Sequence, residues 1–468
     1  MITRNSSYLG PDGMPTPEML GSVISEHQQQ LPRLERLRKY YMADNDIMRR
    51  TRSPGMPNNR IAHPFARYIT AVSAGYLVGR PVSYSTEAQI DTLEQVLDAF
   101  RRGSIASMDA ENARNASIYG VGVEYVYANE DTHLPRVSVL DPRSAFVVYD
   151  ESYELKPLFG VHMTPRTNAE GASLGWTVTV MGRDRIASYS TVALTTRSFE
   201  EVSVTPHYFG DVPLVEYWND ENERGDFEWI VPMIDAYDKL QSDRVNDKEQ
   251  FVDALLVLTG CTMDKDERGR SPIRQLREDK MLSLPDTQAG AQYLTAQIDE
   301  DGAEILRAAL VEDIHKMSMV PNLSDKDFAA NASGVAMKYK LWGLEQLTNI
   351  KQQWFTEGLR MRLKLFINFL IARGAPALDV ADVKISFTRA LPANKLEIAQ
   401  YVQTAEAAGA MSTRTKVETL HEGEEWSQED LDEEVEEINI EKGYSGPDPL
   451  DPALGDAEND ITEEVTAE

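Results

Sequence analysis

Few residues in this sequence could do chemistry, and they do not form a known catalytic motif. Cys261 is the single cysteine, and no histidine flanks it in the sequence. This context favours a small packed residue over a nucleophile. The GxxxxGK(S/T) phosphate loop, the GxSxG elbow, the HExxH zinc motif and the CxxC pair are all missing from the sequence. We therefore predict that the protein is not an enzyme and uses no cofactor or metal.

Two groups of side chains have spacings that could suit a cation. Glu312 and His315 form an ExxH pair on one helix face. Helical two-metal sites need two such pairs and further carboxylates, so we favour a solvated or capping histidine near a helix end. Asp235, Asp238 and Asp243 are spaced by three and five residues. A hydrated face of a long helix explains this spacing more simply than cation ligands do.

The formal net charge of −29 is concentrated at the C-terminal end. From residue 421 onward there are 19 acidic residues and one lysine, a net charge of −18, which leaves −11 for the first 420 residues. Tight sequence-specific DNA binding needs cationic contacts to phosphate, so the charge disfavours that class. It remains compatible with a protein past which DNA slides without sticking. Charge alone favours the simpler reading, that acidity maintains solubility.

The composition, 42% hydrophobic and 26% charged, is typical of a soluble globular protein with several modules. The longest apolar run, residues 365–372, is interrupted by Asn368 and is far shorter than the roughly 20 residues of a membrane span. The N-terminal residues lack the apolar core of a signal peptide. A single cysteine suits a reducing cytoplasm.

The periodicity of the first half predicts helices followed by a β layer. Apolar residues recur at helical spacing from Leu31 to Tyr41. Further helices are expected over about 64–78, 87–101 and 105–119. Between residues 120 and 218, short β-branched and aromatic runs alternate with turn residues, which predicts an antiparallel β layer. The expected fold class is α+β.

Long helices dominate the second half. Helices of residues 229–258 and 299–320 flank a turn-rich module at 260–297, and the polar segment 322–333 follows. A helix over 334–373 would be about 60 Å long, with Ser333 as its expected N-cap. It is basic, with seven Lys/Arg against two Glu, and Gly343 and Gly358 are candidate bends. A strand at 382–388 is expected to return to the first domain's sheet.

The exposed faces of such long helices are a natural contact surface between the subunits of a ring. After residue 390, two or three small helices follow, and the tail from about residue 443 is expected to be disordered.

Five sequence blocks, spread over about residues 31–410, carry a recognisable order of residues. They are KYYMADNDIMRR; NNRIAHPFARYITAVSAGYLVGRPV, with Asn59, Ile61, Tyr76, Leu77, Gly79 and Pro81; YGVGVEYVYANED and LDPRSAFVVYD, with Tyr119, Gly120, Asp141 and Pro142; VPLVEYWND and GDFEWIVPMIDAYDKLQSDRVND, with Pro213, Asn219, Asp235, Tyr237, Ser242, Asp243 and Asn246; and MVPNLSDKDFAANASGVAMKYKLWGLE, with Pro321, Phe328, Asn331, Ser333, Gly334 and Lys340. In this order the blocks resemble the portal (head-to-tail connector) proteins of siphophage-type tailed bacteriophages.

The resemblance implies a portal fold with an α/β wing, a two-helix stem, a small clip, a very long wing helix and a helical crown. The implied boundaries are 1–30 for an N-terminal extension, 31–226 for the wing, 227–259 and 299–321 for the stem helices, 260–298 for the clip, 322–333 for the tunnel loop, 334–390 for the long helix and returning strand, 391–442 for the crown and 443–468 for the acidic tail. Residues 1–30 and the tail match nothing in the family.

The resemblance also implies which residues meet DNA and partner proteins. The tunnel loop would face the DNA channel with Asn322, Leu323, Ser324, Asp325, Lys326, Asp327, Phe328 and Asn331. Its small polar groups suit weak contact with a moving duplex. Without the resemblance, the segment would be read as a plain helix connection. The family's stem segment carries Asp235, Tyr237, Ser242, Asp243 and Asn246.

The implied partners follow from the same resemblance. Twelve copies would form a ring at the portal vertex of the virion, assembled in the host cytoplasm, with double-stranded DNA passing non-specifically through it. The clip would dock terminase and then head-completion adaptor proteins, and the wing and crown would face major capsid and scaffold proteins. The clip carries a basic cluster of Arg268, Arg270, Arg274 and Arg277. These arginines could meet a motor surface or DNA, or be ordinary solvated charges.

Two other classes of function stay open at this point. A nuclease or motor subunit would need a phosphate loop or a clustered carboxylate site. A capsid scaffold or shell protein without a DNA channel would assemble into closed shells rather than rings.

Overall fold

The computed structural model describes residues 1–54, 56–88, 90–195, 198–251, 255–259, 290–294, 300–323, 334–389, 395–421 and 428–441. The chain forms two compact units, Met1–Phe328 with Lys340–Phe387, and Ala329–Tyr339 with Thr388–Glu468. The first unit combines helices with sheets, and the described part of the second is helical. The predicted α+β class is confirmed.

A six-stranded sheet has the order β1-β5-β6-β7-β8-β9. Neighbouring strands are antiparallel except β1 and β5, which are parallel. The strands are β1 (Ile2–Thr3), β5 (Ala145–Tyr149), β6 (Pro157–Thr167), β7 (Ser173–Met181), β8 (Arg185–Thr191) and β9 (Glu200–Pro206). The predicted antiparallel layer is therefore mostly this sheet.

Helix α1 (Pro17–Tyr41) packs against the six-stranded sheet. Its N-cap Thr16 accepts a hydrogen bond from the Met19 N–H at 3.3 Å. Leu20, Val23 and Ile24 are buried with the sheet's hydrophobic side chains. Residues 1–30, set apart as an extension in the sequence, thus supply β1 and the first half of α1. Three glutamines at 28–30 and Pro32 obscure this helix in the sequence.

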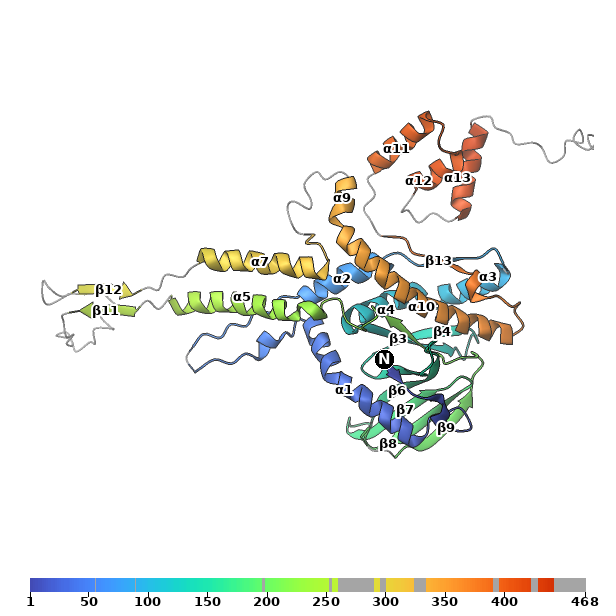
Figure 1. The fold of residues 1–468 in the computed structure, drawn as a ribbon, viewed down its shortest axis with the longest axis horizontal. Helices are drawn as coiled ribbons and strands as arrows, with labels where there is room; N and C mark the ends of the chain where they lie inside the picture. The colour runs from blue at the N-terminus through green and yellow to red at the C-terminus, as the bar shows by residue number, and fades with distance from the viewer. Residues whose placement is uncertain are drawn as a thin grey trace, which may run out of the picture. The chain divides into compact units, whose positions relative to one another are not determined.

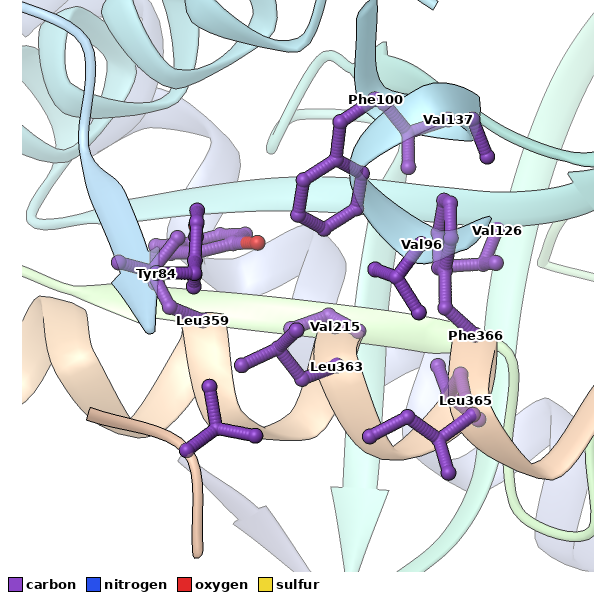
Figure 2. Packing of buried hydrophobic residues seen from close by; sticks show 14 of the residues in the cluster. Tyr84, Val96, Phe100, Val126, Val137, Val215, Leu359, Leu363, Leu365 and Phe366 are labelled. Carbon is purple, nitrogen blue, oxygen red and sulfur yellow. The ribbon is translucent and has the colours of Figure 1, made fainter. Parts of the chain in front are cut away.

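A second core lies between a three-stranded sheet and four helices. The sheet has the order β10-β3-β4. The elements are α2 (Phe65–Val78), α3 (Ile90–Arg102), α4 (Ile105–Tyr119), β3 (Val121–Ala128), β4 (Pro135–Leu140), β10 (Leu214–Trp218) and α10 (Trp342–Ala372). Figure 2 shows Leu359, Leu363 and Phe366 of α10 in one cluster with Val96 and Phe100 of α3.

The helix predicted over 334–373 is divided. Its first part is α9 (Gly334–Lys340), and the helical pattern is interrupted at Leu341 before α10 begins. Gly358, a candidate bend, has another role: a Cβ built there would lie 2.4 Å from the Tyr217 ring. Glycine is therefore needed for the close approach of α10 to β10.

Two helices lie side by side in the first unit, α5 (Val231–Phe251) and α7 (Glu300–Ser318) (Figure 1). The guanidinium of Arg244 on α5 donates to Glu300 and Glu304 on α7, each at 3.1 Å. Between them in sequence, β11 (Leu255–Thr259) pairs antiparallel with β12 (Gly290–Leu294). The helix predicted over 229–258 is thus shorter, because its last apolar run forms a strand.

The strand predicted at 382–388 does not join either large sheet. It is β13 (Lys384–Ser386), which pairs with β2 (Ser83–Ser85) in a separate two-stranded sheet. The second unit contains α11 (Lys395–Ala407), α12 (Thr413–Leu420) and α13 (Gln428–Glu441). Ser333 and residues 443–468 lie outside the described residues. None of the helices in the described ranges has the length and apolar character that crossing a bilayer requires.

Candidate functional site

The described residues 42–54 and 56–64, here called the strap, lie along α5 and are held by side chains of that helix. Three alternate main-chain N–H groups near the end of the strap donate to α5: Asn59 to Asn246 Oδ1 at 2.6 Å, Ile61 to Ser242 Oγ at 3.0 Å, and His63 to Asp238 Oδ1 at 2.9 Å. The strap and the helix run in opposite directions, because the donor numbers rise as the acceptor numbers fall.

The spacing of the donors along the strap matches the spacing of the acceptors along α5. Two residues of extended chain cover about 6.6 Å, and four residues of α-helix cover about 6 Å. Acceptors at 238, 242 and 246 therefore meet donors at 63, 61 and 59 one by one. All three acceptor residues are fully buried, so each pairing satisfies an acceptor that water cannot reach. This ladder sets the register of the strap on α5.

Asp238 accepts more than one hydrogen bond from the strap. Its carboxylate also accepts from His63 Nδ1 at 3.0 Å and from Asn45 Nδ2 at 2.6 Å. Tyr237 contacts the same region, with its ring edge-on to His63 at 4.7 Å and to Phe65 at 5.1 Å between centroids.

The other two aspartates of the series also bind the N-terminal part of the chain. Asp235 accepts hydrogen bonds from Tyr40 Oη and from Arg36 Nη2, the latter at 3.3 Å. Burial raises the pKa of Asp235, and the hydrogen bond from Tyr40 opposes that rise. Asp243 pairs with Arg50 at 2.7 Å and with Arg52. The hydrated-face interpretation of this series is wrong, because this face of α5 is a docking face.

The segment that leads into the predicted tunnel loop is fixed at its root. His315 Nδ1 donates to the Val320 carbonyl at 2.9 Å, so the histidine ties the turn that follows α7 back to the helix. Tyr68 Oη donates to the Pro321 carbonyl at 2.7 Å and accepts from the Leu323 N–H at 2.9 Å. Met319 has a positive φ of 56°, which turns the chain sharply after the helix. These contacts fix residues 319–323 against α2 and α7.

The ExxH pair has a structural explanation. His315 is engaged with the Val320 carbonyl, and the described residues contain no group of three or more side chains able to hold a metal ion.

The structure brings together the five predicted stem residues, since Asp235, Tyr237, Ser242, Asp243 and Asn246 all face α1, α2 or the strap. Asn322 and Leu323 belong to the fixed root. The other tunnel-loop residues (Ser324, Asp325, Lys326, Asp327, Phe328 and Asn331) and the clip arginines (Arg268, Arg270, Arg274 and Arg277) lie outside the described residues.

Two buried ion pairs anchor α10, and sequence reasoning missed both. Arg362 is fully buried and donates to both oxygens of Glu124, at 2.8 and 2.6 Å, and lies 2.6 Å from Asp109. Lys351 Nζ lies 2.7 Å from Asp226. The basic character of this helix therefore matches buried acids of the same unit. The one signal in the sequence was the presence of these cations in a helix stretch rich in apolar residues, which indicates buried acidic partners.

Sequence reasoning also missed the contact between the strap and α5. The available signal was the four-residue spacing of the small polar residues 238, 242 and 246, which places them on one helix face. Together, the strap ladder, the α5–α7 contacts and the fixed root tie α5, α7 and residues 319–323 to the rest of the first unit. This arrangement holds segments of the chain in place, and among the residues that the structure describes here no nucleophile, base and oxyanion donors come together.

Comparison with known proteins gives a consistent result. The profile of the family described as "Phage portal protein, SPP1 Gp6-like" matches residues 20–446. The portal protein of Bacillus phage SPP1 is 23% identical over 431 residues, covering 86% of this chain and 83% of that protein. The portal protein of Clostridium phage phiCD119 is 20% identical over 401 residues, covering 81% and 87%.

Solved structures also show similarity. A chain of "Neck of native GTA particle computed with C12 symmetry" has a TM-score of 0.45 and 14% identity, covering 76% of this chain and 89% of that chain. A chain of "Neck of empty GTA particle computed with C6 symmetry" has a TM-score of 0.45 and 14% identity, covering 75% and 88%.

Proposed function

Because the chain belongs to the SPP1 Gp6-like family of phage portal proteins, we propose that twelve copies close into a ring at one vertex of a phage capsid. Viral DNA passes through the centre of this ring during packaging and ejection. The family match over residues 20–446 carries the proposal, because it includes the strap, both stem helices and the root of the tunnel loop. As a portal protein, the chain is a virion component and a subunit of an oligomeric ring.

Specific segments of the chain take specific roles in this proposal. Residues 322–333 form the tunnel loop that faces DNA, and the contacts of Tyr68 and His315 support a fixed root for it. Residues 260–298 form the clip, where terminase and then head-completion adaptors dock. Arg268, Arg270, Arg274 and Arg277 contribute to that surface. The wing and crown face capsid and scaffold proteins, and assembly takes place in the host cytoplasm.

The contacts that hold α5, α7 and the root of the tunnel loop support a passive channel. A loop that touches moving DNA must keep its position while its contacts with the duplex stay weak. The strap ladder and the root contacts supply the first condition. The polar, weakly charged sequence of residues 322–333 supplies the second. The family is structural, and we expect the purified chain to hydrolyse no nucleotide.

Negative-stain electron microscopy of the purified full chain tests the proposal. The expected result is rings with a central hole, and class averages with twelve-fold symmetry. Closed shells would favour a scaffold or capsid protein, and a monomer at all concentrations would contradict the ring. ATP turnover by the purified chain, measured as phosphate release, would contradict the non-enzymatic role.

A further inference from the structure

The α5–α7 pair has two outer flanks that point in different directions. The strap contacts α5 through Asp238, Ser242 and Asn246, whereas α7 contacts it through Arg244 and Lys248. At 100° per residue these two sets lie about 140° apart around α5. Figure 1 shows the strap and α7 on opposite sides of α5. The order across the pair is therefore strap, α5, α7.

The strap flank consists of the strap and the neighbouring Lys239 of α5. It exposes three large apolar side chains, with Met42 61% exposed, Met48 39% and Met56 51%. Its exposed charges are mixed: Arg49 pairs with Asp44 and Asp46, and Asp46 is itself exposed. The basic part of the flank consists of Arg60 and Lys239, which are both exposed. Arg60 donates to the uncharged Met48 carbonyl.

The α7 flank is the face of α7 directed away from α5. It also exposes three large apolar side chains, with Ile305 71% exposed, Leu306 50% and Met317 54%. Its outward charges are mainly acidic: Asp301, Glu312 and Asp313 are exposed, with Lys316 as the opposing cation.

A hollow of 930 Å³ opens beside the α7 flank. It is lined by α7, the residues just after it and the start of α10, including Ala308, Glu312 and Met319. Flexible methionine side chains can fill irregular apolar spaces of this kind, and the strap flank presents three methionines.

A ring built from one kind of subunit needs two different, complementary surfaces on each copy. The strap flank and the α7 flank meet this condition. They lie on opposite sides of the helix pair, and Arg60 and Lys239 on the strap flank are opposite in charge to the acidic residues of the α7 flank. Each flank exposes three large apolar side chains whose burial on association would be favourable. We propose that the α7 flank of each subunit packs against the strap flank of the next subunit in the ring. This inference rests on the proposed ring and identifies the surfaces that close it.

Charge reversal on each flank tests the contact with the full-length protein. The strap-flank variant is Arg60→Glu with Lys239→Glu, and the α7-flank variant is Glu312→Lys with Asp313→Lys. These side chains are exposed, so we expect native circular dichroism and thermal unfolding. Each variant alone brings like charges together at every interface. The protomer concentration at half-assembly, measured by analytical ultracentrifugation, should rise at least about tenfold.

Two rescue experiments make the test specific. The quadruple variant, and a one-to-one mixture of the two double variants, both restore opposite charges at each interface and should restore assembly. The matched control is Glu151→Lys with Glu170→Lys, which reverses two exposed charges on turns of the six-stranded sheet and should assemble like the wild type.

The outcomes separate the two proposals. Wild-type rings together with normal assembly of both double variants would overturn the flank contact and leave the ring intact. Loss of assembly without rescue in the quadruple variant would also overturn it, because charge complementarity would not be the cause. Failure of the wild type to form rings would overturn the proposed function and this inference together.

Discussion

Removal of single acceptors from α5 should release the strap in a graded way. Ser242→Ala removes the hydroxyl that accepts the Ile61 N–H at 3.0 Å. Asp238→Ala removes a buried carboxylate that accepts from Asn45 Nδ2 and from both the N–H and Nδ1 of His63. Because each change leaves its donors without a partner on a buried face, the strap should detach from α5 more often.

The magnitudes follow from the number and charge of the lost hydrogen bonds. Leaving one buried donor unsatisfied costs about 1–2 kcal/mol, so Ser242→Ala should speed hydrogen exchange of the Ile61 amide by about 5- to 30-fold. Three donors lose a charged acceptor in Asp238→Ala. A cost of at least about 3 kcal/mol corresponds to exchange about 150-fold faster, or more, at His63.

Hydrogen exchange with mass spectrometry on peptides that cover residues 58–64 measures both effects at a fixed protomer concentration. Lys248→Ala is the matched control, because its exposed side chain pairs with Glu300 of α7 and not with the strap, and exchange in the strap should stay unchanged. Exchange within twofold of wild type in Ser242→Ala would refute the ladder as the element that fixes the strap. Equal effects of Ser242→Ala and Asp238→Ala would refute the claim that the effect grows with the number of donors that lose their acceptor.

Three further predictions concern the first unit, each measured by urea unfolding at fixed protomer concentration. Arg362→Met leaves the buried Glu124 carboxylate without its cation and should lower the free energy of unfolding by about 3–5 kcal/mol; adding Glu124→Gln should recover part of that loss, and no recovery would contradict the pairing. Gly358→Ala should destabilise by about 1–3 kcal/mol through the clash with Tyr217, despite the better helix propensity of alanine; a stability gain would show that the ring can move aside. Burial raises the pKa of Glu216 from 4.5 to about 6, so the folded state binds its proton more tightly than the unfolded state. This contribution to stability is fully present below pH 4.5 and is lost as the pH rises through about 6, at a cost of about 2 kcal/mol. Glu216→Gln should remove this pH-dependent loss, and an unchanged profile would contradict the assignment.

The positions of most helices and strands could be predicted from periodicity. The helix at 105–119 has the predicted bounds, and the alternating runs between 120 and 218 form strands β3 to β10. The helix predicted from Leu31 to Tyr41 is shorter than α1, because three glutamines and a proline interrupt the apolar pattern of the sequence. The run at 255–259 was assigned to a helix although it forms β11. A short apolar run fits either period, and its cross-strand partner β12 lies more than 30 residues away.

The candidate site was also predicted only in part. Residues 235–246 were singled out because they match a family block, yet their aspartates were read as a hydrated face. That reading considered α5 alone. Asn59, Ile61 and His63 lie some 180 residues earlier in the chain, and no periodicity within α5 indicates that an extended segment covers it.

The sequence by itself determined the fold class, the approximate positions of the two long helices, the polar composition of the segment that follows them and the membership of the portal family. These properties depend on local periodicity and on blocks of neighbouring residues. The tertiary structure alone decided which charges meet. Asp238 binds the strap, Arg362 lies buried on Glu124, and the strap and α7 occupy opposite sides of α5. The physical reason is that a hydrogen bond or ion pair depends on distances of about 3 Å between atoms, and only packing brings residues more than a hundred positions apart to such distances.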